Sequence, residues 1–467
     1  MTQSDPQNPA QTQGYVPLED QGDAARYFER VCDALEAENR GQLLADLQAL
    51  HPADAADMLE QLSSDQFTHL VGFLGKDLPS DILIELRDEY REDAVELLSD
   101  SAVGAALEDL DSDDATTILE DVDEARRERI LDELDPEDRA PLEQALDFDE
   151  ETAGRLMQRE FVAAPEFWTV GHTIDHARET GNDLPDQFFE VYIVDPSFKV
   201  KGAVSLPLLL RSPREARLDD IMSEVNVEIK TGMDQEEVAY LFQKYSLASA
   251  PVVDTAGRIT GMITVDDMVD VIQEENTEDF LALSGVSSAD GSDNVWETVR
   301  ARAPWLGVNL ITAFLVSGVI SLFEAALDRI IALAILMPVV AALAGNAGSQ
   351  ALAVTVRAIA EREMHGAAAR RAIWRELYTG LVNGFIFGIG VGAISWLWFR
   401  DVWLSGVIGA AIWLTFICGC LAGILIPLGL ARMRADPAVA SSVFVLTVTD
   451  VLSFFSFLGL ATLILLN

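Results

Sequence analysis

The uneven distribution of charge along the chain constrains its fold more than any other feature. Residues 1–300 carry 69 Asp and Glu against 22 Lys and Arg, whereas residues 301–467 carry 8 against 10. In this second part, apolar runs cover about 304–326, 330–355, 378–399, 403–431 and 440–466. Each run is near or above the ~20 residues that a helix needs to span a bilayer. The sequence therefore predicts a five-span membrane domain behind an acidic soluble part, and it excludes a single soluble globule and a nucleic-acid binder with a basic face.

Arginine is concentrated in alternate connections between these runs. The connection after the second run holds five Arg and the one after the fourth holds two, whereas each of the other two holds one. Because positively charged connections stay on the cytoplasmic side, the soluble N-terminal part is predicted to be cytoplasmic and the C-terminus to lie outside. We expect a multi-pass protein of the cytoplasmic membrane.

The acidic part begins with a polar segment, residues 1–23, which is predicted to be a disordered tail. Residues 24–150 place apolar residues at three- and four-residue spacing, with Asp, Ser and Pro clusters at the expected helix starts. This pattern predicts an acidic, superhelical array of short helices without catalytic groups. Only five of the 32 basic residues are Lys, and abundant Asp and Glu with scarce Lys is typical of proteins from salt-loving organisms.

Residues 151–275 contain an internal duplication. Strand-like segments end at Asp195 and Asp254, and a second strand follows each of them through Gly202 and Gly261. Both pairs are 59 residues apart, so the two copies share one register. Each copy has Val- and Ile-rich strands around an Asp- and Gly-containing turn. The segment resembles a tandem pair of CBS modules, which have an α/β fold.

Polar residues inside the apolar runs are few. Asp450 lies in the middle of the last run, with Thr447 and Ser453 three residues to either side. A charge facing lipid would cost ~3 kcal/mol or more, so Asp450 is expected to face a water-filled path or a partner. The alternative is a structural hydrogen bond between helices.

The second run contains Pro338, Gly345 and Gly348 beside the amides of Asn346 and Gln350. This composition predicts an interrupted helix whose freed carbonyls line a cavity. The alternative is close helix packing through small residues. Glu324, at the end of the first run, is either functional or a surface carboxylate.

The order of these parts, with several local motifs, resembles the MgtE family of magnesium channels. The motifs are His51-Pro-Ala-Asp54, Asp234-Gln-Glu-Glu237, Pro251-Val-Val-Asp254, Thr264-Val-Asp-Asp267, Glu275-Asn-Thr-Glu-Asp279, Gly345-Asn-x-Gly-x-Gln350, Asp436-Pro437 and Asp450. The resemblance implies a multidomain fold, with a helical N-terminal domain over 24–150, tandem CBS domains over 151–275, a connecting plug-like helix over 276–303 and a five-helix pore domain over 304–467.

The resemblance also implies a homodimer whose pore runs between the subunits. Partly hydrated Mg²⁺ is then held at Asp450, with Gly345, Asn346 and Gln350 nearby, and Glu324 is a further candidate. This agrees with the reluctance of Mg²⁺ to lose its water.

In the cytoplasmic part, the residues that match Mg²⁺-sensing positions of the family are Asp113, Asp234, Glu236, Asp267, Asp270, Glu275, Glu278 and Asp279. Bound Mg²⁺ is expected to draw the helical and CBS domains together and to close the pore, so Mg²⁺ is both substrate and regulator. ATP is a candidate ligand of the CBS pair.

Two other functions stay open. One is a carrier of another divalent cation, such as Co²⁺ or Mn²⁺, on the same architecture, and the other is a membrane regulator whose CBS pair senses nucleotides. An enzyme is not expected, because the sequence contains no nucleophile–base pair, phosphate loop, C-x-x-C or H-E-x-x-H pattern.

Overall fold

The computed structural model describes residues 21–180, 184–185, 187–283, 295–362, 364, 366–433 and 437–466. The chain divides into two compact units, Met1–Ile272 and Gln273–Asn467. Most of the tail predicted over 1–23 lies outside the described residues, and the first helix begins at Gln21. Asp436, part of one family motif, also lies outside them.

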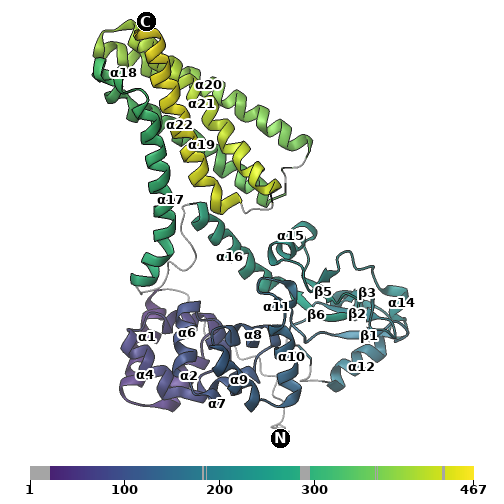
Figure 1. Cartoon of the computed structure of the whole chain (residues 1–467). Helices are drawn as coiled ribbons and strands as arrows, with labels where there is room; N and C mark the ends of the chain where they lie inside the picture. The colour runs from purple at the N-terminus through teal and green to yellow at the C-terminus, as the bar shows by residue number, and fades with distance from the viewer. Residues whose placement is uncertain are drawn as a thin grey trace. The chain divides into compact units, whose positions relative to one another are not determined.

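The first part of the Met1–Ile272 unit is an array of short helices (Figure 1). Its elements are α1 (Gln21–Glu36), α2 (Arg40–Gln48), α3 (Pro52–Leu59), α4 (Ser64–Leu74), the 3₁₀ turn η1 (Gly75–Asp77), α5 (Ser80–Ile84), α6 (Asp88–Leu97), α7 (Asp100–Leu107), α8 (Ser112–Glu120), α9 (Glu124–Glu133) and α10 (Pro136–Leu146).

Side-chain caps or a proline mark the start of several of these helices. Ser63 and Gln66 form a reciprocal capping box at the start of α4, and Pro52 occupies the first position of α3. One continuous core of Leu, Ile, Val and Ala joins the helices, with Leu43, Leu70 and Ile118 fully buried. The predicted helical array is confirmed.

The CBS pair follows in the same unit. Its elements are α11 (Ala153–Leu156), β1 (Ala163–Pro165), α12 (Val170–Thr180), β2 (Glu190–Val194), β3 (Val200–Ser205), α13 (Leu206–Arg211), α14 (Leu218–Ile221), β4 (Ile229–Lys230), α15 (Gln235–Tyr245), β5 (Ser249–Val253), β6 (Ile259–Thr264) and α16 (Val265–Leu283).

The strands form two sheets of the same topology, ordered β1-β2-β3 and β4-β5-β6. In each sheet the first pair is parallel and the second antiparallel. The register is also the same, because Ile193 pairs with Gly202 and Val252 with Gly261, and a bulge follows each of these pairs. The predicted duplication is confirmed.

The two CBS modules exchange the segments that lead into them. Ser223, on the way to β4, exchanges backbone hydrogen bonds with Ala203 of β3, and Gln158, on the way to β1, does the same with Met262 of β6. A Cβ on Gly202 would lie 2.7 Å from the carbonyl oxygen of Ser223. Glycine at this position, and at the equivalent Gly261, therefore permits the close approach of the exchanged segment.

The Gln273–Asn467 unit contains the apolar helices. Its elements are the last part of α16, α17 (Val295–Ser321), α18 (Glu324–Arg329), α19 (Ile331–Ala360), α20 (Ala367–Phe399), α21 (Val402–Arg432) and α22 (Pro437–Leu465). Five stretches in the described residues are long and apolar enough to span a membrane: Thr298–Ser321, Ile331–Ala360, Ala367–Phe399, Val402–Arg432 and Ser442–Leu465. The fold class expected from the sequence is confirmed.

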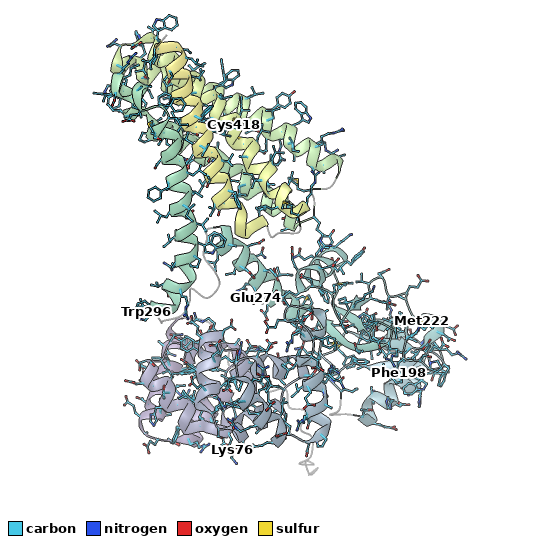
Figure 2. All side chains as sticks on the ribbon, viewed as in Figure 1. Lys76, Phe198, Met222, Glu274, Trp296 and Cys418 are labelled. Atoms are coloured by element: carbon cyan, nitrogen blue, oxygen red, sulfur yellow. The ribbon has the colours of Figure 1, made fainter. Side chains whose placement is uncertain are left out.

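Helix α21 is central to this bundle. It packs against α19, α20 and α22, which run alongside it (Figure 1), and Cys418, labelled in Figure 2, lies on it. Gly380, Gly384 and Gly388 recur every fourth residue on α20, and a Cβ on Gly388 would lie 2.6 Å from the carbonyl oxygen of Gly409 on α21. Small residues at helix spacing thus bring these two backbones together.

The structure describes only the two ends of the segment predicted as one connecting helix over 276–303. Its first part continues α16, which ends at Leu283, and its last part is the start of α17, which begins at Val295. Residues 284–294 lie outside the described part of the chain. Near the end of α16, Ala282 packs against Leu352 and Val356 of α19 and Val445 of α22.

Candidate functional site

Asp450 is a half-buried carboxylate in the middle of α22. The hydroxyls of Thr447 and Ser453 donate to carbonyls of their own helix, those of Val443 and Thr449. In the described part of the chain, the Asp450 carboxylate has no hydrogen-bond or ion-pair partner. A carboxylate among apolar helices is costly unless water, a cation or another subunit compensates it.

The predicted interruption of the second span is wrong. Helix α19 is continuous from Ile331 to Ala360, with Pro338 inside it. Pro338 has no N–H, so it leaves only the carbonyl one turn before it without its helical donor. The carbonyls of Gly345 and Gly348 are therefore part of a regular helix and are not freed as expected.

The two glycines instead serve close packing between helices, the alternative that the sequence left open. A Cβ on Gly348 would lie 3.0 Å from side-chain atoms of both Val445 and Thr449 on α22. Gly345 is half-buried, and a Cβ there would lie 3.7 Å from Leu446. This packing places the Gly345–Gly348 turn of α19 beside the turn of α22 that precedes Asp450.

Three polar residues of α19 lie on its exposed face. Asn346, Ser349 and Gln350 are all exposed, and the exposed Ala342 and Ala353 extend the same face at helical spacing. The structure thus brings the predicted Asn346 and Gln350 onto one surface, next to the helix that carries Asp450. Three polar side chains on a membrane-length helix are expected to face water or protein rather than lipid.

Glu324 is not within a span. Helix α17 ends at Ser321, and Glu324 is the exposed first residue of the short α18. The neighbouring Phe323 anchors this connection by an edge-on contact with Phe455 of α22, at 5.9 Å between ring centroids. The expectation that Glu324 closes the first span is therefore wrong, because the helix terminates three residues earlier.

A cluster of carboxylates has members in both the helical array and the CBS pair. Asp113 and Asp114 occupy the first turn of α8, and Asp267 occupies the first turn of α16. The Asp267 carboxylate accepts hydrogen bonds from the hydroxyl of Thr264 at 2.6 Å and from its N–H at 3.3 Å. Nearby, the Ser112 hydroxyl donates to Glu160 at 2.9 Å.

Burial and mutual repulsion strongly perturb this cluster. Burial, followed by Asp267 and neighbouring carboxylates, raises the pKa of Asp114 to about 7. The pKa of Asp113 is raised well above its usual range by burial and then by Asp267. Burial also raises the pKa of Asp267 to about 6, although the Thr264 hydroxyl opposes the change. No Lys or Arg is among the principal groups that shift these three pKa values.

Part of this cluster was not predicted from the sequence. Asp114 adjoins the predicted Asp113, and that adjacency was the only local signal. Burial, with contributions from Asp270 and Asp81 against an opposing one from His51, raises the pKa of Glu85. Only the folded chain places Glu85 near this cluster, and no local sequence pattern predicts it.

Two further predicted sensor residues, Asp234 and Glu236, lie at the start of α15. Asp234 caps α15 by accepting a hydrogen bond from the N–H of Glu236 at 3.0 Å, and both side chains are exposed. The cap is a structural function that the sequence motif does not distinguish from cation binding.

Helix α16 carries the remaining predicted acids. Asp270 and Glu278 lie on the same face as Asp267, while Glu275 and Asp279 lie to one side of it. Glu274, labelled in Figure 2, shares the first face and was not predicted, although its spacing from Asp270 is visible in the sequence. In the described residues, no three His, Cys, Asp or Glu side chains are already arranged to hold a metal ion.

Three family models match the chain. Residues 337–460 match MgtE, described as a divalent cation transporter. Residues 50–151 match the MgtE intracellular N domain, and residues 218–274 match the CBS domain.

Curated relatives agree with these matches. The magnesium transporter MgtE of Thermus thermophilus is 33% identical over 334 residues, which cover 70% of this chain and 73% of that protein. The magnesium transporter MgtE of Bacillus subtilis is 29% identical over 421 residues, 89% of this chain and 92% of that protein. Among solved structures, the cytosolic domain of the Mg²⁺ channel MgtE in complex with ATP matches with 32% identity and a TM-score of 0.49, covering 52% of this chain and 99% of that one.

The fold and these matches define a membrane transporter of divalent cations rather than an enzyme. The chain belongs to the MgtE family. The family predicted from the sequence motifs is thereby confirmed, whereas the individual cation ligands and ATP at the CBS pair stay predictions.

Proposed function

We propose that this chain conducts Mg²⁺ across the cytoplasmic membrane as a homodimer, and that cytosolic Mg²⁺ closes the path by binding to the acidic cluster of the helical and CBS domains. The single observation that carries the ion path is Asp450 in the middle of α22, beside the polar face of α19 and without a partner among the residues that the structure describes. The relatives of this chain are magnesium transporters by name.

The exposed polar face of α19 supports a homodimer with the path at its axis. In one subunit, Asn346, Ser349 and Gln350 face outward from the helix bundle. A second copy would cover them and would bring two Asp450 carboxylates to one constriction. Such a pair, with amide groups nearby, suits Mg²⁺, which keeps several of its water ligands. Residues 1–283 are then cytoplasmic and the C-terminus lies outside, in keeping with the arginine distribution.

The acidic cluster supports closure by cytosolic Mg²⁺. The Asp267 carboxylate on α16 repels those of Asp113 and Asp114 on α8. Without a cation their repulsion disfavours the docked arrangement, whereas a divalent cation between them would stabilise it. The cation then shifts the equilibrium because it binds the docked arrangement more tightly than the open one. In a salt-rich cytosol, screening leaves direct coordination as the main contribution.

Helix α16 offers a route from this cluster to the ion path. Its first turn carries Asp267, and its last turn places Ala282 against α19 and α22. A displacement of one continuous helix would therefore reach both helices that carry the proposed path.

The test is Mg²⁺ influx into proteoliposomes with an entrapped indicator. The wild type is compared with Asp450→Asn and with Asp328→Asn, which removes an exposed carboxylate of α18 as a matched control. We expect influx to vanish only in Asp450→Asn and to fall in the wild type as sensor-side Mg²⁺ rises. Influx that survives Asp450→Asn would remove this residue from the path.

The same vesicles separate the alternatives. Preferential uptake of Co²⁺ or Mn²⁺ over Mg²⁺ would favour a carrier of another divalent cation. If Asp450→Asn leaves flux unchanged while ATP binding controls a partner, the nucleotide-sensing regulator becomes the better hypothesis.

A further inference from the structure

Helix α12 of the CBS pair carries two of the five histidines of the chain, one turn apart. His172 and His176 are related as i and i+4, so their Cβ atoms lie on one helix face about 5–6 Å apart. Both side chains are exposed. Both rings also contact the indole of Trp168, at 4.3 and 5.0 Å between centroids and with an interplanar angle of 80° in each case.

We propose that His172 and His176 together chelate a late first-row transition-metal cation, such as Cu²⁺, Ni²⁺ or Zn²⁺, on the outer face of α12. Two neutral imidazoles at this helical spacing are a recognised metal-binding pair, and imidazole nitrogen is a preferred ligand of these ions. Mg²⁺ instead demands oxygen ligands in an octahedral arrangement. The pair therefore selects a class of cation that differs from the one proposed for Asp450 and the acidic cluster.

The surroundings hold the pair in place. The shared contact with Trp168 restricts both imidazoles to one side of the helix. The start of α12 is anchored by backbone hydrogen bonds from Val170 to Ala216, at 2.9 Å, and from Gly171 to Arg214, at 2.8 Å. Ligands on an anchored helix lose little conformational freedom when a metal binds, which favours binding.

The nearby charges leave the imidazoles as the main ligands. Asp175, on the same face, accepts two hydrogen bonds from Arg214 at 2.6 and 2.7 Å, so its carboxylate is already ion-paired. Glu179, three residues beyond His176, is exposed and extends the face with a negative charge. No third His, Cys, Asp or Glu is placed as a ligand in the described residues, so water fills the other coordination positions.

A purely structural explanation makes a different prediction. If the two rings serve only to cover Trp168, each binds metal no better than any single exposed histidine. His69 is the matched control, because it is also exposed on a helix and contacts an aromatic ring, Phe73, at 6.1 Å between centroids.

The experiment is calorimetric titration of tag-free, metal-stripped full-length protein in detergent with Ni²⁺, in a background of millimolar Mg²⁺ that occupies carboxylate sites. We expect one Ni²⁺ site whose affinity falls at least about tenfold in His172→Gln and in His176→Gln, because chelation makes the second contact intramolecular. The affinity should not change in His69→Gln. Equal affinities in the wild type and in either single variant would overturn the proposal, as would an equal loss in His69→Gln.

Cu²⁺ gives an independent readout. The electron paramagnetic resonance spectrum of the bound ion should show coupling to two nitrogens in the wild type and to one in each single variant. A spectrum with only oxygen ligands in the wild type would also overturn the proposal. Neither measurement depends on transport, so failure here leaves the proposed Mg²⁺ path untouched.

Discussion

Neutralising Asp114 should stabilise the cytosolic part of the protein when Mg²⁺ is absent. Asp114 has a pKa of about 7 instead of 3.8, because burial disfavours its charge and Asp267 repels it. Each pKa unit corresponds to about 1.4 kcal/mol, so the ionised carboxylate costs up to about 4 kcal/mol at neutral pH. The Asp114→Asn side chain has no charge to bury, so this cost disappears.

The sign of the pH dependence follows from the raised pKa. Below about pH 4 the carboxyl is protonated in both the folded and the unfolded state, and it costs nothing. The cost grows as the pH rises from about 4 to 7 and is constant above that. In a chelator-containing buffer, the wild type should therefore lose stability over this range, and Asp114→Asn should lose less.

The assay is the thermal unfolding midpoint of the full-length protein in detergent at pH 7.5. Because α8 and α16 can separate locally before the whole unit unfolds, 4 kcal/mol is an upper limit. We expect Asp114→Asn to raise the midpoint by at least about 3 °C without Mg²⁺ and to gain less than the wild type when Mg²⁺ is added. Asp93→Asn, at an exposed position of α6, is the control and should leave the midpoint unchanged. An unchanged or lower midpoint in Asp114→Asn would show that the ionised Asp114 does not destabilise the folded protein.

Three further predictions concern packing. Gly348→Val should destabilise the helix bundle by about 1–3 kcal/mol, because the added side chain overpacks against α22. Thermal aggregation of the detergent-solubilised protein detects this loss of stability. Gly429→Val is the control and should not destabilise the bundle, because its side chain meets open space. Arg91→Met should cost the helical array about 3–5 kcal/mol in denaturant unfolding, because it leaves the largely buried Asp121 side chain without the partner 2.6 Å away. Adding Asp121→Leu should recover much of that loss, and no recovery would show that the pair is not coupled. Ala282→Leu should shift the sensor-side Mg²⁺ concentration that half-closes the path by at least about threefold in the vesicle assay. About 0.7 kcal/mol of strain is enough for a shift of this size. An unchanged concentration would show that the end of α16 takes no part in gating.

Local patterns predicted the layout of this protein. Five apolar stretches, the short capped helices and the duplicated strand–turn–strand units all follow from residue spacing, because helix and strand periodicity depend on neighbours a few residues away. Asp450 could be singled out for the same reason, since one charge within an apolar run is visible without a structure.

The role of Gly345 and Gly348 could not be read from that spacing. Pro and Gly in a span are compatible both with a broken helix and with close packing. The contacts of Gly348 with Val445 and Thr449, about a hundred residues further along the chain, decide for packing. A helix that is supported on two sides keeps its regular hydrogen bonds around such residues.

The sequence alone determined the order of domains, the number of apolar helices and the position of Asp450 within the last one. The electrostatic interaction among particular acidic residues, including the unpredicted Asp114 and Glu85, became visible only in the folded structure. Asp113 and Asp114 meet Asp267 across more than 150 positions of the chain. Desolvation and Coulomb repulsion depend on distance in space and on burial, and neither quantity is encoded in the identity of a residue or in that of its sequence neighbours.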